Sequence, residues 1–136
     1  MTSELAIAVH AIVFLDHHKD VESSSQIAQN VCTNPSRLRK VLAKLHKAEL
    51  LAAKEGKEGG CYFALRPEEV SLYTILKAVD EKPVSVSIHT GDVDKECLIA
   101  SGMGAIMDEI YGTMNIACEE VLKKITIADI EKKIFN

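Results

Sequence analysis

The dipeptide Asn34-Pro35 marks the start of a helix, and this boundary constrains the fold more than any other feature of the chain. Asparagine is a good N-cap, and proline suits the first helical position because its ring fixes φ near the helical value and no N–H is needed there. Over the following residues, to about Ala48, apolar side chains recur at i, i+3, i+4 and i+7 while the opposite face is polar and mostly basic. The sequence therefore predicts an amphipathic helix whose buried stripe is Leu38, Val41, Leu42 and Leu45.

Shorter elements flank this helix on both sides. Residues 3 to about 17 predict an apolar core helix, and the serines at 23, 24 and 25 are alternative N-caps for a short helix from Gln26 to about Val31. After the basic helix, residues 50–53 and 61–65 are strand candidates separated by a glycine-containing turn. The order helix, short helix, helix, hairpin is that of a winged helix-turn-helix.

The second half of the chain predicts three more helices. Ser71 can cap a helix over residues 72–79 that closes the core, and Thr126 can cap a short helix over residues 127–135. Between them lie an expected loop, residues 83–91, and a long helix from about 94 to 124. Its apolar residues repeat every three or four positions, more than one small domain can cover, so we expect the same helix of a second chain to cover them. The candidate dimerisation residues are Met103, Ile106, Ile110, Met114, Ala117 and Val121.

These elements predict a mainly α fold with a small β-hairpin wing. We expect residues 1–82 to form a winged helix-turn-helix DNA-binding domain and residues 83–136 to supply a linker and dimerisation helices. The longest apolar run, Leu5 to Leu15, is shorter than the roughly 20 residues of a membrane span, and no charged n-region precedes it. We therefore expect a cytoplasmic protein without a membrane partner.

The distribution of charge indicates a nucleic-acid partner although the formal net charge is −4. Residues 1–66 hold nine Lys or Arg and seven Asp or Glu, which gives +2, and residues 67–136 hold seven and thirteen, which gives −6. Residues 33–57 alone hold seven basic and two acidic residues, which gives +5. A local basic patch attracts phosphate whatever the overall charge is, so double-stranded DNA is the expected partner.

A helix-turn-helix places the N-terminal part of its second helix in the major groove. Ser36 and Arg37 are the candidates for base contacts, since arginine can pair bidentately with guanine and serine can bond several bases. Lys40 and Lys44 are candidates for phosphate contacts. The full set of candidate DNA-binding residues is Ser24, Thr33, Ser36, Arg37, Arg39, Lys40, Lys44, Lys54, Lys57, Gly59 and Tyr62.

Two other classes of function are alternatives to DNA binding. A winged helix can serve only protein contacts, but such a module does not need arginines at the start of its third helix. An enzyme is not expected, because the chain contains no glycine-rich phosphate loop, no H-E-x-x-H motif and no convincing Ser/His/Asp spacing. The sequence therefore favours a sequence-specific DNA-binding regulator, with the protein-interaction module as the alternative.

Four motifs in a fixed order carry a resemblance to a known family. They are the helix end from Leu42 to Leu50, the wing Gly59 to Tyr62, the segment Ile75 to Asp80 and the closing segment Thr126 to Ile130. In this order and spacing the chain resembles the Rrf-two family of bacterial winged-helix regulators over nearly its whole length. The resemblance implies a transcriptional regulator, expected to be a repressor, that acts as a homodimer. A dimer of this kind requires a near-palindromic operator.

Two departures from the family pattern concern the turn that ends the basic helix and the sensor. Glu49 stands where the family has glycine, so a residue that readily adopts positive φ is missing and we expect the turn to be reshaped. Cluster-binding members carry three closely spaced cysteines before the long helix, and this chain has only Cys97 there. We therefore expect no iron–sulfur cluster, no other cofactor and no metal.

Cys97 is instead a candidate redox sensor, because it lies in a polar stretch just before the dimerisation helix. The neighbouring acids argue against this role, since negative charge raises a thiol pKa. The other three cysteines are interpreted as small apolar core residues, although Cys61 lies in the wing and oxidation there is a further alternative.

Overall fold

The computed structural model describes residues 4–86 and 88–136, which form two compact units. The winged-helix unit lies within residues 2–81 and 122–136, and the linker-helix unit is residues 82–121. Ser3, the expected first residue of the first helix, lies outside the described residues. The fold is mainly helical with one two-stranded antiparallel hairpin, which confirms the expected fold class.

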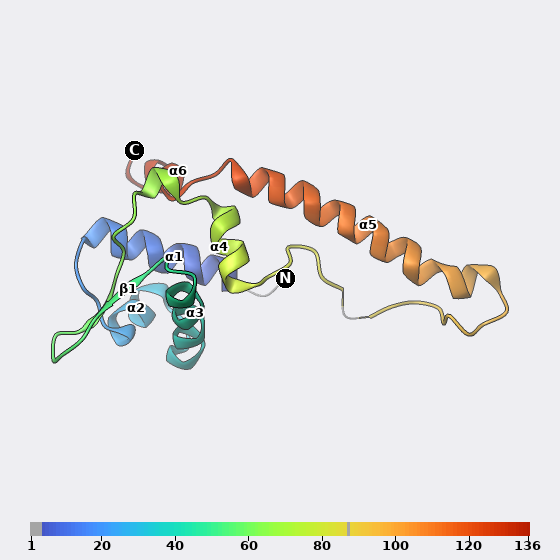
Figure 1. The fold of residues 1–136 in the computed structure, drawn as a ribbon, viewed down its shortest axis with the longest axis horizontal. Coiled ribbons are helices and arrows are strands. Elements are labelled where there is room, and N and C mark those ends of the chain that lie inside the picture. The colour runs from blue at the N-terminus through green and yellow to red at the C-terminus, as the bar shows by residue number, and fades with distance from the viewer. Residues whose placement is uncertain (1–3, 87) are drawn as a thin grey trace. The chain divides into compact units, whose positions relative to one another are not determined.

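The winged-helix unit contains every element except the long helix (Figure 1). Three helices come first and are followed by the wing and two further helices. The elements are α1 (Glu4–His18), α2 (Ser24–Val31), α3 (Pro35–Lys47), β1 (Ala52–Lys54), β2 (Gly60–Tyr62), a 3-10 turn η1 (Pro67–Glu69), α4 (Leu72–Val79) and α6 (Ile127–Phe135).

Side-chain caps set the starts of four of these helices. Ser23 caps α2, and Gln26 returns a bond to the Ser23 N–H, so the first of the three candidate serines is the cap. Asn34, Ser71 and Thr126 cap α3, α4 and α6, as expected. Each cap oxygen accepts from backbone N–H groups that the first turn of a helix leaves unpaired.

The wing strands are shorter than expected. We predicted strands at 50–53 and 61–65, but only three residues on each side pair, with Ala53 opposite Cys61. Leu50, Leu51 and Phe63 instead bury their side chains in the core. A third segment joins the outer edge of β2, because Glu22 and Cys61 exchange backbone hydrogen bonds of 3.0 and 2.8 Å.

The core forms where α1, α3, α4 and the start of α6 meet. Ile12, Leu45 and Ile75 have no solvent exposure, and neither does Ile127. We expected residues 83–136 to stand together as the dimerisation part, but Ile127 places α6 in the winged-helix unit. The backbone bonds Leu72 N to Ile125 O (2.8 Å) and Ile127 N to Val70 O (3.0 Å) hold the segment before α6 against the start of α4.

The linker-helix unit contains most of helix α5 (Leu98–Lys123) and the segment that precedes it. The Asn115 side chain holds both backbone groups of Val84, at 2.7 and 3.0 Å, and His89 contacts Asp108 at 3.1 Å. The helix begins at Leu98 rather than near residue 94, because the Asp92 N–H turns back to the Ala100 carbonyl at 2.9 Å. In the part of the chain that the structure describes, no helix combines the length and the apolar character that crossing a bilayer requires.

Candidate nucleic-acid interface

The N-terminal turn of α3 is rigidly defined by its cap. The Asn34 side-chain oxygen accepts from the Ser36 N–H at 2.8 Å and from the Arg37 N–H at 3.3 Å. Leu38 anchors the same turn in the core with no exposure. The side chains of Ser36 and Arg37 therefore project to solvent from a fixed backbone, the arrangement that base-edge recognition needs.

The exposed side of α3 continues this surface. Arg39 and Lys40 are exposed, whereas Thr33 is half-buried and joins the end of α2 through its N–H bond to the Ala28 carbonyl. Ser24 is half-buried in the first turn of α2, next to the actual cap Ser23. The structure thus brings four exposed polar or basic side chains together on one helix, namely Ser36, Arg37, Arg39 and Lys40.

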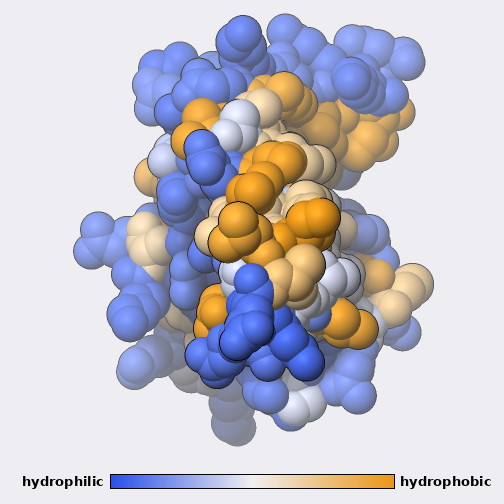
Figure 2. Space-filling view, turned by 90° about the vertical axis from the view of Figure 1, so that its right-hand side faces the viewer, coloured by the Kyte–Doolittle hydropathy of each residue, from blue (hydrophilic) through white to orange (hydrophobic). Residues whose placement is uncertain are grey.

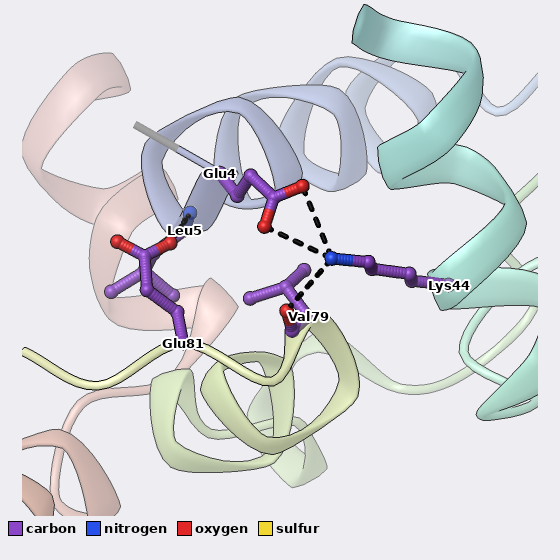
Figure 3. Close-up of polar contacts among 5 residues, drawn as sticks. All are labelled: Glu4, Leu5, Lys44, Val79 and Glu81. Atoms are coloured by element: carbon purple, nitrogen blue, oxygen red, sulfur yellow. Dashed lines mark hydrogen bonds and ion pairs between the residues drawn. The ribbon is translucent and has the colours of Figure 1, made fainter. Parts of the chain in front are cut away.

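Lys44, for which we expect a phosphate contact, makes contacts within the protein. Its ammonium lies 3.0 and 3.2 Å from the two carboxylate oxygens of Glu4, and 3.2 Å from the Val79 carbonyl (Figure 3). In the same view Glu81 accepts the Leu5 N–H at 3.0 Å. Lys44 therefore joins α3 to the start of α1 and the end of α4, while 40% of its side chain stays exposed.

The turn after α3 keeps its form without glycine. Glu49 adopts φ 61°, the left-handed conformation for which glycine is usually selected. The Leu50 N–H bonds the Leu45 carbonyl at 2.9 Å and the Glu49 N–H bonds the His46 carbonyl at 3.0 Å, the two bonds of a Schellman motif. The expected reshaping of this turn is therefore not seen.

The wing contributes a second set of basic side chains. Lys54 and Lys57 are exposed, and together with Gly59 they line a surface hollow between the hairpin and the segment that leads into α2. Tyr62 lines an adjoining hollow with Lys19 and Lys54. The hollows also contain Asp20 and Glu58, so acidic side chains lie beside the lysines there.

The apolar residues of α5 are exposed within the single chain. None of the described residues of this helix is buried, and Ile106 and Val121 have exposed fractions of 54% and 58%. Ile110, Met114 and Ala117 are exposed as well, and Met103 is half-buried. Figure 2 shows hydrophobic side chains gathered near the centre of the face toward the viewer, with hydrophilic ones above and below them.

The exposed thiol of Cys97 precedes the first turn of α5. Hydrogen bonds from the backbone of Ala100 and Ile99 lower its pKa, because N–H groups at a helix start stabilise a thiolate. We expected the neighbouring acids to raise this pKa, but the backbone donors have the larger effect. Within residues 4–86 and 88–136, no three side chains of His, Cys, Asp or Glu form a group that could hold a metal ion.

Sequence reasoning missed a second thiol contact. Cys61 of β2 is buried, and its Sγ lies 3.0 Å from Nε2 of His46, in the last turn of α3. Burial raises the pKa of this thiol. The only signal in the sequence was a histidine at the end of a helix and a cysteine in the next hairpin, and no periodicity indicates that they meet.

Comparisons with known proteins assign this chain to a family. The model of the Rrf2 family, described as an iron-dependent transcriptional regulator, matches residues 1–133. A protein of Bacillus subtilis named as an HTH-type transcriptional regulator, YwnA, is 27% identical over 135 residues, 99% of each chain.

Solved structures show the same fold. A protein of Lactobacillus plantarum described as a transcriptional regulator has a TM-score of 0.84 and 25% identity, with 98% of this chain and 91% of that chain covered. T. potens IscR has a TM-score of 0.70 at 22% identity, with 98% and 87% covered, which is a likeness of fold.

Proposed function

This chain belongs to the Rrf2 family of transcriptional regulators, and from that premise we propose that it is a cytoplasmic homodimer that represses transcription at a near-palindromic operator. It is a regulator with a DNA-binding fold and not an enzyme. The observation that carries the proposal is the exposed basic surface at the start of α3, fixed by the Asn34 cap.

The recognition surface consists of α3 and the wing. Ser36 and Arg37 reach base edges in the major groove, while Arg39 and Lys40 bind phosphates. Lys54 and Lys57 bind the DNA backbone beside the wing. The surface between these contacts is formed by Gly59, Tyr62, Ser24 and Thr33. Lys44 is left out, because Glu4 and the Val79 carbonyl hold its ammonium.

Dimerisation through α5 supplies a second DNA-binding unit. An exposed apolar stripe on a 26-residue helix is unfavourable in water, and a second copy of the same helix covers it. The residues we assign to this contact are Met103, Ile106, Ile110, Met114, Ala117 and Val121. Two α3 helices related by a two-fold axis require half-sites about one helical turn apart, and a dimer bound over a promoter excludes polymerase.

The residues present do not fit an iron centre on the three-cysteine plan. Cys97 is the only cysteine between residues 62 and 117, and the described part of the chain has no group of three possible ligands elsewhere. We therefore propose no cofactor. Cys97 is proposed as a sensing thiol, supported by its exposure and by the backbone N–H groups that lower its pKa.

The test compares three variants on an operator selected from genomic fragments beside the gene. Arg37→Ala should reduce discrimination at one base pair by about 1–3 kcal/mol. Lys40→Ala should weaken binding to all sequences and reduce the salt slope by about one unit. Lys95→Ala, a change of an exposed lysine in the linker-helix unit, is the matched control and should bind as the wild type does.

Two outcomes would contradict the proposal. If Arg37→Ala and Lys40→Ala bind every fragment as the control does, α3 is not the reading element. If the wild type enriches no fragment over random DNA, the protein-interaction module is the better description.

A further inference from the structure

Cys61 and His46 form a nucleophile and base pair that the DNA-binding surface does not use. Sγ and Nε2 are 3.0 Å apart, within hydrogen-bond reach, and the residues come from different elements, β2 and α3. Cys61 has an exposed fraction of 9%, whereas His46 is half-buried. The thiol is therefore shielded while the imidazole can exchange protons with solvent.

The pair lies at the junction of the recognition helix and the wing. Cys61 pairs with Ala53 across the hairpin and exchanges backbone bonds with Glu22, just before α2. His46 lies in the last turn of α3, and its carbonyl accepts the Glu49 N–H of the turn that leads to β1. Any group added at Sγ must therefore displace an element that positions the DNA contacts.

We propose that Cys61 and His46 form an oxidation site for small neutral hydroperoxides, and that oxidation at Sγ lowers the affinity of the protein for its operator. The second half of this proposal rests on the DNA-binding function proposed above. A neutral peroxide suits the site because it carries no charge into a buried position, unlike an anionic oxidant.

The proposed oxidation requires only the Cys61 and His46 side chains and one hydroperoxide molecule. Burial keeps Cys61 as a thiol at rest, and Nε2 of His46, in the tautomer without hydrogen on that nitrogen, accepts its proton. The sulfur forms a bond to the terminal peroxide oxygen as the O–O bond breaks, and the leaving alkoxide takes the proton from Nε2. The sulfur loses two electrons to the peroxide, and the products are Cys61 sulfenic acid and an alcohol, or water from hydrogen peroxide.

The added oxygen changes the interface through packing. An oxygen added to Sγ must be accommodated beside Nε2, which lies only 3.0 Å away, so either His46 or β2 must move. Movement of either one alters the position of the wing lysines relative to α3. The DNA-bound form is then disfavoured.

The experiment treats the Cys97→Ser protein with hydrogen peroxide, traps sulfenic acid with dimedone and maps the labelled peptides. This background removes the exposed thiol of Cys97, while Cys32 stays exposed and serves as an internal comparison. We expect Cys61 to carry the label. Operator affinity should fall about tenfold or more after treatment, equivalent to about 1.4 kcal/mol. Cys61→Ser in the same background should bind DNA equally with and without peroxide.

His46→Asn in that background tests the base. Labelling of Cys61 should become at least about tenfold slower, since a positioned base contributes a large factor to proton transfer. Thermal unfolding monitored by circular dichroism checks that the Cys61→Ser and His46→Asn variants are folded. The peptide mapping in Cys97→Ser alone does not depend on either variant.

The outcomes separate the two proposals. A label on Cys32 or Cys118 without one on Cys61 would overturn the oxidation site. A labelled Cys61 with unchanged operator affinity would overturn its regulatory effect. If the untreated protein binds no operator, the DNA-binding proposal fails, while the mapping still decides whether Cys61 is oxidised.

Discussion

Glu49 holds a left-handed backbone conformation, φ 61°, at the end of the recognition helix. The Cβ of an L-residue is crowded in this region, at a cost of roughly 1–2 kcal/mol, which glycine does not incur. Glu49→Gly should therefore raise the free energy of unfolding by about 1 kcal/mol in urea denaturation. Glu55→Gly, in the wing turn without positive φ, is the control and should give no gain; an equal gain from both would refute the argument.

Glu131 makes the stability of the winged-helix unit depend on pH. Desolvation raises its pKa to about 7, and the hydrogen bond and negative charge of Asp16 act in the same direction. Because the folded pKa lies above the unfolded one, the protonated form stabilises the fold. This contribution is complete below the ordinary pKa of about 4.5 and is lost as the pH rises through about 7.

Glu131→Gln removes the titrating group and should flatten the pH dependence. We expect the variant to be more stable than the wild type at pH 8, where the wild type holds two carboxylates close together. Urea denaturation at several pH values between 4 and 8.5 measures this, with Glu55→Gln as the exposed control. Parallel pH curves for the wild type and Glu131→Gln would show that Glu131 is not the source of the pH dependence.

Cys97 and Cys61 are predicted to differ in reactivity. Backbone donors lower the pKa of the exposed Cys97 thiol, while burial raises that of Cys61. Iodoacetamide at neutral pH should therefore modify Cys97 first, since the thiolate is the reactive form. Peptide mapping over time measures both sites, and faster modification of Cys61 would contradict the backbone effect.

At the level of elements, Lys44 connects α3 with α1 and α4. Its side chain is 40% exposed, so the ion pair with Glu4 is partly screened and should contribute only about 0.5–1 kcal/mol. A double-mutant cycle of Glu4→Gln and Lys44→Met should measure this coupling in thermal unfolding. Lys44→Met should also leave the salt slope of DNA binding unchanged, unlike Lys40→Ala. A reduced slope would show that Lys44 does contact phosphate.

Local chemistry made the helix starts predictable, and distant contacts made other features unpredictable. Asn34, Ser71 and Thr126 cap helices through bonds that span two or three residues, so their effect is visible in the sequence. The Lys44 to Glu4 contact spans 40 residues. The placement of α6 and the contact between His46 and Cys61 likewise arise from packing, and no residue period encodes them.

The ends of the wing strands and the start of the long helix were also not predictable from the sequence. Strand lengths were overestimated because the core takes Leu50, Leu51 and Phe63, whose apolar character also suits a strand. The expected start of α5 lies four residues before Leu98, because Asp92 and Asp94 are good N-cap residues and nothing local marks Leu98 as the first helical residue. The candidate base-contacting residues followed from the Asn34-Pro35 boundary, and their role stays a prediction.

For the whole molecule, the exposed stripe of α5 predicts the oligomeric state. Replacement of Ile106 and Ile110 together by aspartate would place two charges in the proposed interface, where desolvation has a large free-energy cost. Sedimentation should then report a monomer instead of a dimer, and operator affinity should fall. Glu109→Gln, on the same helix, is the control. An unchanged mass for the double variant would exclude α5 as the dimer contact.

That stripe also links occupancy of the promoter to gene dosage. If only paired chains read both half-sites, the amount of active regulator in dilute conditions varies with the square of its cellular concentration. Halving of the protein at cell division would then lower the active species about fourfold. In that case the uncovered side chains of one helix make the amount of active regulator depend more steeply than linearly on the protein's own concentration.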